Sequence, residues 1–140
     1  MRAVKKKLFF FDVPVYDREI CVIVGMNHKE ALEAAKKQKC TPSFMKAMQW
    51  EDLIELCNKV NDKDCETEGA ALRANDTRYF LVLKPYKNDW KYLDCLNHEV
   101  FHIVQFMGHI IKFWDDVEPP AYLQSWLFKE LRRALSGKKK

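Results

Sequence analysis

The sequence lacks the long apolar run that a membrane-spanning helix requires. No stretch of the 140 residues approaches the roughly 20 consecutive apolar residues needed to cross a bilayer. The basic start followed by residues 8–15 imitates a signal peptide, but Asp12 and Pro14 interrupt the apolar run and no small-residue cleavage site follows. We therefore expect no membrane association and a cytoplasmic location.

Paired cysteines are missing as well. The chain has five cysteines, an odd number, and none of them forms a C-x-x-C pair. This pattern argues against a secreted disulfide framework and against a cysteine-based structural zinc site, and it fits a reducing cytosol. No internal repeat and no second domain are visible, so we predict one domain over residues 1–140.

The net charge of +4 comes largely from the two ends of the chain. The residues that carry it are Arg2, Lys5, Lys6, Lys7 and Lys138, Lys139 and Lys140. Charges gathered in this way are typical of short solvated basic tails rather than of a nucleic-acid surface on the folded domain. We therefore expect no nucleic-acid partner.

Hydrophobic periodicity predicts a small α+β domain. The first half of the chain is expected to contain a β-hairpin and two helices. The hairpin pairs residues 8–15 with 19–25 through a polar turn at 16–18. Asn27 and Glu30 form a capping-box pattern that begins a helix running to about Lys39. Thr41-Pro42 starts a second helix that ends before Asn61.

The second half of the chain is expected to contain one strand and two helices. Residues 78–83 form an apolar run typical of a strand, whereas residues 69–74 are too few to assign. Asn88 or Asp89 can cap a helix that starts at Trp90. A last helix is predicted from about Glu118 to Leu135.

The motif that carries chemistry is H-E-x-x-H at residues 98–102. On a helix, His98 and His102 lie one turn apart on the same face, which suits two ligands that converge on one tetrahedral zinc ion. Glu99 follows the first histidine and lies beside the metal, where it can take a proton from zinc-bound water. The alternative is a pair of histidines on an amphipathic helix with no metal.

A catalytic zinc needs a third protein ligand and an open position. Glu118, at the start of the last predicted helix, is the preferred third ligand, with Asp115 and Asp116 as competitors. The alternative is that Glu118 binds no metal and only stabilises the N-terminus of its helix by its negative charge. Cys95, one turn before His98, would close the coordination sphere as a fourth ligand and make the zinc structural.

His109 lies near the same helical stripe but is excluded as a ligand. It is two turns beyond His102, roughly 10 Å along the helix axis, too far to share the ion. His109, Tyr122 and Tyr79 are instead candidates to line the cleft or to stabilise an oxyanion.

These residues resemble a gluzincin-like zinc metallopeptidase, in which an H-E-x-x-H helix is followed by a helix that carries a glutamate ligand. Glu118 to Tyr122 is similar to the E-x-x-A-Y pattern of small phage-encoded metallopeptidase-like proteins, and the motif resemblance covers about Leu93 to Leu127. It implies a zincin-like fold, zinc on His98, His102 and Glu118, and a peptide substrate. It further implies that residues 78–83 form the edge strand along which the substrate lies.

The resemblance leads to two functional hypotheses. The first is a zinc metallopeptidase in which Glu99 is the general base and a protein or peptide is the substrate. The second is a zinc-stabilised binding module without turnover, such as a phage antagonist of a host protein, which the short chain and the lack of an obvious oxyanion histidine motivate. The sequence does not indicate the oligomeric state.

Overall fold

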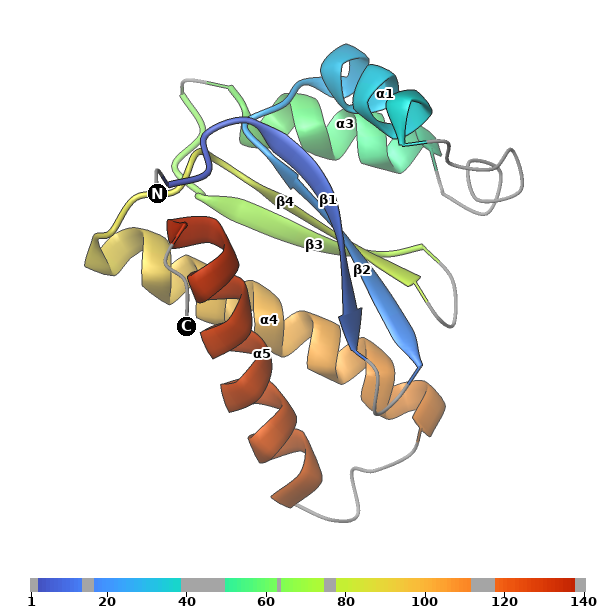
Figure 1. Cartoon of the computed structure of the whole chain (residues 1–140), viewed down its shortest axis with the longest axis vertical. Helices are drawn as coiled ribbons and strands as arrows, with labels where there is room; N and C mark the ends of the chain where they lie inside the picture. The colour runs from blue at the N-terminus through green and yellow to red at the C-terminus, as the bar shows by residue number, and fades with distance from the viewer. Residues whose placement is uncertain are drawn as a thin grey trace.

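The computed structural model describes residues 3–13, 17–38, 50–62, 64–74, 78–111 and 118–137. Over these ranges the chain is a three-layer α+β structure, in which α1 and α3 cover one face of a sheet and α4 and α5 cover the other (Figure 1). The strands are β1 (Lys7–Val13), β2 (Arg18–Val24), β3 (Gly69–Arg73) and β4 (Arg78–Leu83). The helices are α1 (His28–Lys37), α3 (Trp50–Val60), α4 (Trp90–Ile111) and α5 (Glu118–Ser136). The predicted α+β class is confirmed.

The predicted hairpin is also confirmed. β1 and β2 pair antiparallel along their whole lengths, with Lys7 opposite Val24 and Val13 opposite Arg18. Asp17 lies in the connection with a φ of 52°, the left-handed region that aspartate tolerates better than most residues. The chain therefore turns where the polar residues at 16–18 predicted it.

The strand order is β1-β2-β4-β3, with β2 and β4 parallel. The prediction that residues 78–83 form an edge strand is therefore wrong, because β4 lies between β2 and β3. The physical reason is visible in its composition. From Tyr79 to Leu83 every residue is buried, which requires cover on both faces and is typical of an interior strand.

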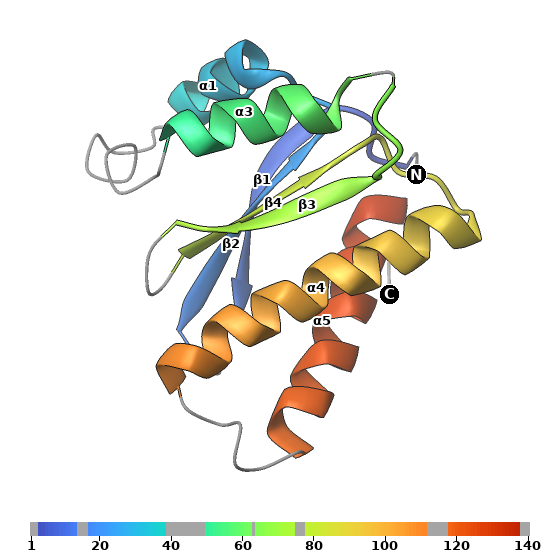
Figure 2. The ribbon, with the colours of Figure 1, turned by 180° about the vertical axis from the view of Figure 1, so that it is seen from behind.

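The edge strand on that side of the sheet is β3, which the sequence left unassigned. β3 pairs antiparallel with β4, so that Gly69 lies opposite Leu83 and Arg73 opposite Tyr79. Only five residues long, β3 offers little periodicity to read. α4 packs directly against it (Figure 2).

The sheet separates two hydrophobic cores. Alternate residues of the central strands point to opposite faces, so that Val22 and Leu81 belong to the core under α4 and α5, whereas Ile23 and Val82 belong to the core under α1 and α3. On the first side α4 contributes Leu96, Val100, Ile103 and Met107 to the core, all fully buried. This packing fixes the rotation of α4 about its axis.

The helix boundaries largely follow the sequence signals. At the start of α1, the Asn27 side chain accepts from the Glu30 N–H (3.0 Å) and the Glu30 carboxylate accepts from the Asn27 N–H (3.2 Å), as the capping box predicts. α4 begins at Trp90, and Asp89 caps it by accepting from the Tyr92 N–H (2.8 Å). The predicted helix start at Thr41-Pro42 lies outside the described residues. Within the described part of the chain, no helix is long and apolar enough to cross a membrane.

Candidate metal centre

His98 and His102 converge in the structure. Their Nε2 atoms are 3.0 Å apart, and their rings meet edge to face at 87° with centroids 4.6 Å apart. Two imidazole nitrogens bound to one tetrahedral zinc, each about 2.0–2.1 Å from the metal, would be about 3.3 Å apart. The separation in α4 is therefore close to what a shared ion requires. Without a metal, one of the two nitrogens must carry a proton and the other must accept it, because two N–H donors cannot face each other at this distance.

The convergence of the two rings follows from the helix. Residues at i and i+4 lie one above the other on a helix face, and the buried Leu96, Val100 and Ile103 hold the opposite side of α4 in the core. The motif face is thereby directed away from the core, with His98 exposed and His102 half-buried. The predicted helical placement of the motif is confirmed.

Glu99 is the third member of the cluster. Its carboxylate and the two imidazoles offer ligand atoms that all lie within 4.8 Å of one another. The Glu99 side chain is buried, at 7% exposure. Burial raises the pKa of Glu99 above its usual range, although His102, His98 and a hydrogen bond from the backbone of Ala71 act in the opposite direction. A raised pKa makes the carboxylate a stronger base, as proton abstraction near neutral pH requires.

Gln105 orients His102, a contact that the sequence analysis missed. Its side-chain oxygen lies 3.1 Å from Nδ1 of His102. An Nδ1–H donated to this acceptor leaves the lone pair of Nε2 free for a metal ligand bond. The signal that could have revealed Gln105 is its position three residues after His102 on the same helix.

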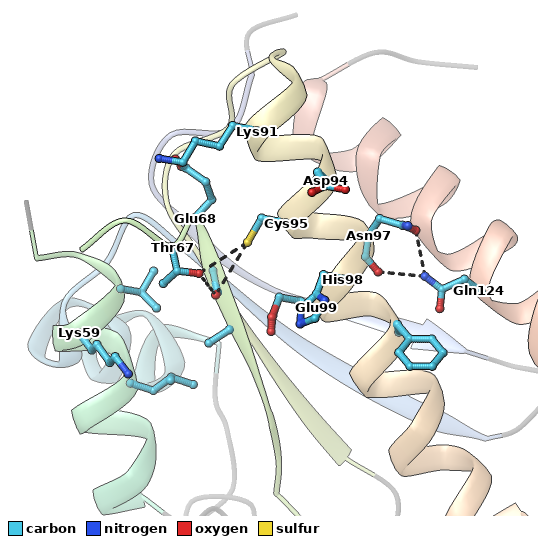
Figure 3. Close-up of a pocket in the computed structure, with 15 residues that line it drawn as sticks. Lys59, Thr67, Glu68, Lys91, Asp94, Cys95, Asn97, His98, Glu99 and Gln124 are labelled. Atoms are coloured by element: carbon cyan, nitrogen blue, oxygen red, sulfur yellow. Dashed lines mark hydrogen bonds and ion pairs between the residues drawn. The ribbon is translucent and has the colours of Figure 1, made fainter. Parts of the chain in front are cut away.

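A cavity of about 830 Å³ opens beside the motif, between β3, α3 and α4. His98 and Glu99 line it together with Glu68 and Cys95, as Figure 3 shows. Gly69 is a further lining residue. The edge strand therefore forms a wall of the site, and the Ala71 backbone ties Glu99 to that wall. A substrate in the cavity would contact the candidate base directly.

Cys95 is directed at β3. Its Sγ lies 3.8 Å from the Thr67 hydroxyl and 4.0 Å from the Gly69 carbonyl oxygen, and burial raises the pKa of its thiol. The group of convergent ligand atoms in the described part of the chain comprises His98, Glu99 and His102, without Cys95. The geometry thus gives no support to Cys95 as a fourth ligand.

The third ligand stays a prediction. Glu118 is the first residue of α5, as expected, but its side chain lies outside the part of the chain that the structure describes, as do Asp115, Asp116 and the side chain of His109.

The two tyrosines suggested for the oxyanion lie away from the cavity. Tyr122 is 71% exposed on α5, whereas Tyr79 is 1% exposed and stacks on Phe106 in the core (centroids 6.1 Å apart). Neither is among the described residues that line the cavity. Their catalytic role therefore also stays a prediction.

Comparisons of the chain with protein-family models, with curated proteins and with solved structures found no match. The chemistry of the site must therefore be argued from its own geometry. The donor set fits a divalent transition metal, since imidazole nitrogen and carboxylate oxygen are common ligands of zinc.

Proposed function

We propose that this protein is a zinc-dependent hydrolase that cleaves peptide bonds in the cytoplasm. The observation that carries the proposal is the combination on α4 of two imidazole nitrogens 3.0 Å apart with a buried carboxylate beside them. Two of these groups, His98 and Glu99, line a cavity large enough for part of a peptide. The proposed location is supported by the free thiols of Cys57, Cys65 and Cys95 in the described part of the chain.

In the proposed reaction His98, His102 and Glu118 would hold the metal, and Glu99 would be the general base. When bound, zinc lowers the pKa of a coordinated water to about 7 and polarises the substrate carbonyl. The Glu99 carboxylate accepts the proton of the attacking water and then delivers it to the leaving amine. Its burial supports this role, because an environment poor in water favours the protonated carboxyl that the second step requires.

The proposed substrate lies along β3. An edge strand has backbone N–H and C=O groups on its outer side that can pair with an extended peptide. Gly69 and Ala70 of β3 line the cavity that contains Glu99. A peptide added there would extend the sheet beyond β3 and bring its backbone toward the motif.

The deciding experiment compares Glu99→Gln with the wild-type protein. We expect the substitution to lower kcat by at least about a hundredfold, since general-base catalysis contributes factors of this size, while one equivalent of zinc stays bound. Glu33→Gln is the matched control, because Glu33 is exposed on α1, on the other face of the sheet. Zinc content is measured by atomic absorption and turnover with a peptide library.

The outcomes separate the two functional hypotheses. Undiminished turnover in Glu99→Gln contradicts the role of Glu99. Stoichiometric zinc in a wild-type protein that cleaves no peptide favours the zinc-stabilised binding module.

A further inference from the structure

Two charged side chains are buried in the described part of the chain, Glu68 and Glu99, and both line the same cavity. Glu99 has a role in the proposed reaction, whereas Glu68 does not. Glu68 immediately precedes β3, and its side chain is 6% exposed. Figure 3 places it at the end of the cavity near Lys91, on the far side of Cys95 from His98.

The Glu68 carboxylate is incompletely paired. Its Oε1 lies 3.6 Å from Nζ of Lys91, beyond normal hydrogen-bond length, and the Lys91 side chain is 66% exposed. Water screens an ion pair of this kind, so the pair contributes little to the stability of the protein. Its buried Oε2 finds no hydrogen-bond partner among the described residues. A buried carboxylate with an unpaired oxygen is costly, and because Glu68 lines the cavity, electrostatic attraction to a cationic ligand group there would offset part of this cost.

The other charged side chains do not neutralise this end of the cavity. Lys59 and Lys91 also line it, but both are exposed and can extend their ammonium groups into water. Asp94, a further lining residue, is exposed as well. The charges that are shielded from solvent are therefore both negative, which favours a positively charged ligand group.

We propose that Glu68 binds a cationic group of the substrate, either a lysine or arginine side chain or a free N-terminal ammonium. Identifying the ligand as a substrate rests on the proposed function, but binding of the cation does not require hydrolysis. Glu68 would thus determine specificity, selecting peptides that carry a positive charge near the bond presented to Glu99.

The first test measures binding of small cations to the full-length, zinc-loaded protein by NMR titration. n-Butylammonium and n-butylguanidinium represent basic side chains, an alanyl-alanine amide represents the free N-terminus, and n-butanol and the acetylated dipeptide are their neutral counterparts. We expect a cation to bind more tightly than its neutral counterpart and to shift the amide signals of Gly69 and Cys95. Equal binding of cations and neutral analogues overturns the proposal. Which of the cations binds identifies the source of the charge.

The second test uses Glu68→Gln with Asp94→Asn as the matched control. Both variants remove one carboxylate from the cavity, but only the first removes the buried one. We expect the dissociation constant of the cation to rise at least about tenfold in Glu68→Gln and less than about twofold in Asp94→Asn. Similar effects of the two variants overturn the proposal, as does unchanged binding in Glu68→Gln, which is also the result if the amine binds only the metal.

Thermal unfolding distinguishes recognition from a structural ion pair. If Glu68 serves only to pair with Lys91, Glu68→Gln and Lys91→Met should lower the melting temperature equally. The proposal predicts that Glu68→Gln is at least as stable as the wild type.

Lys91→Met tests cation binding by Glu68 independently if Glu68→Gln does not fold. It removes a competing ammonium group from Oε1, so we expect cation binding to tighten about two- to threefold. Weaker binding in Lys91→Met overturns the proposal.

Hydrolysis is scored separately with peptides that differ by one lysine or norleucine. Cation binding in a protein that cleaves nothing contradicts the proposed function alone. Cleavage without a preference for charged peptides contradicts the role of Glu68 alone.

Discussion

At the scale of single residues, the hydrogen bond between Gln105 and His102 determines which tautomer His102 adopts in the proposed metal centre. The Gln105 oxygen lies 3.1 Å from Nδ1 of His102. By holding the proton on Nδ1, it selects the tautomer whose Nε2 can bind zinc. In the proposed metal centre Gln105 would therefore be a positioning residue that acts through His102 and does not itself contact the metal.

We expect Gln105→Leu to weaken zinc binding by about 10- to 100-fold, the range typical for loss of a second partner of a metal-bound histidine. Gln105→Glu is the matched variant, because it restores an acceptor of the same length and should bind zinc at least as well as the wild type. The dissociation constants are measured by competition with a chelator of known affinity. Equal zinc affinity in Gln105→Leu and the wild type would show that Gln105 does not orient the ligand.

Also at this scale, the sequence predicted the members of the motif but not their partners. The i, i+4 spacing of His98 and His102 is a local property of a helix and could be predicted directly. The bond from Ala71 to Glu99 joins two segments far apart in the chain, and no local pattern encodes it. The placement of Glu68 in the same cavity likewise depends on contacts between segments that are far apart in the chain.

At the scale of secondary-structure elements, the sequence predicted those with strong local signals. The capping box of α1, the Asp89 cap of α4 and the hairpin were all found where expected. β3 was missed because five residues carry little periodicity, and β4 was misplaced because the order of strands depends on pairing between distant segments. The wall of the cavity is the part that local signals could not reveal.

The close approach of β3 to β4 depends on Gly69. A Cβ atom at this position would lie 2.5 Å from Cδ2 of Leu83 and 2.8 Å from the Val82 carbonyl oxygen. The carbonyl belongs to an interior strand and cannot move easily. We expect Gly69→Ala to lower the free energy of unfolding by about 1–3 kcal/mol, as overpacking usually does, measured by urea denaturation.

Because Gly69 also lines the cavity, Gly69→Ala should weaken the cation binding assigned to Glu68 along with stability. A variant as stable as the wild type would mean that β3 can shift freely, and the contact with β4 would then not fix the position of the wall.

At the scale of the whole molecule, the sheet separates a structural layer, covered by α1 and α3, from a functional layer, the side of α4 that carries the proposed site. The core under α1 and α3 is composed of apolar residues, whereas both buried carboxylates lie on the side of α4. Burial of a charge lowers stability unless a partner compensates it. Groups in the functional layer should therefore make the stability of the protein depend on pH and on metal, whereas the structural layer should contribute no such dependence.

Glu99 allows this difference to be measured in the metal-free protein. Burial raises its folded-state pKa above the unfolded value of about 4.5. Between the two pKa values the folded state binds more protons than the unfolded state, so the stability of the wild type falls as pH rises through this window. Above the folded-state pKa the buried carboxylate of Glu99 is charged, and the loss of stability is complete.

In chelator-treated protein we therefore expect Glu99→Gln to be more stable than the wild type near neutral pH, because the buried charge is gone. The advantage should shrink as pH falls through the folded pKa of Glu99, where the wild-type carboxyl is itself neutral. Urea unfolding between about pH 4 and about pH 8 measures the difference, and Glu33→Gln, exposed on α1, should show no such trend. A stability difference that does not change with pH would mean that the Glu99 carboxylate is hydrated in the folded state, and its burial could then not be what makes it a base.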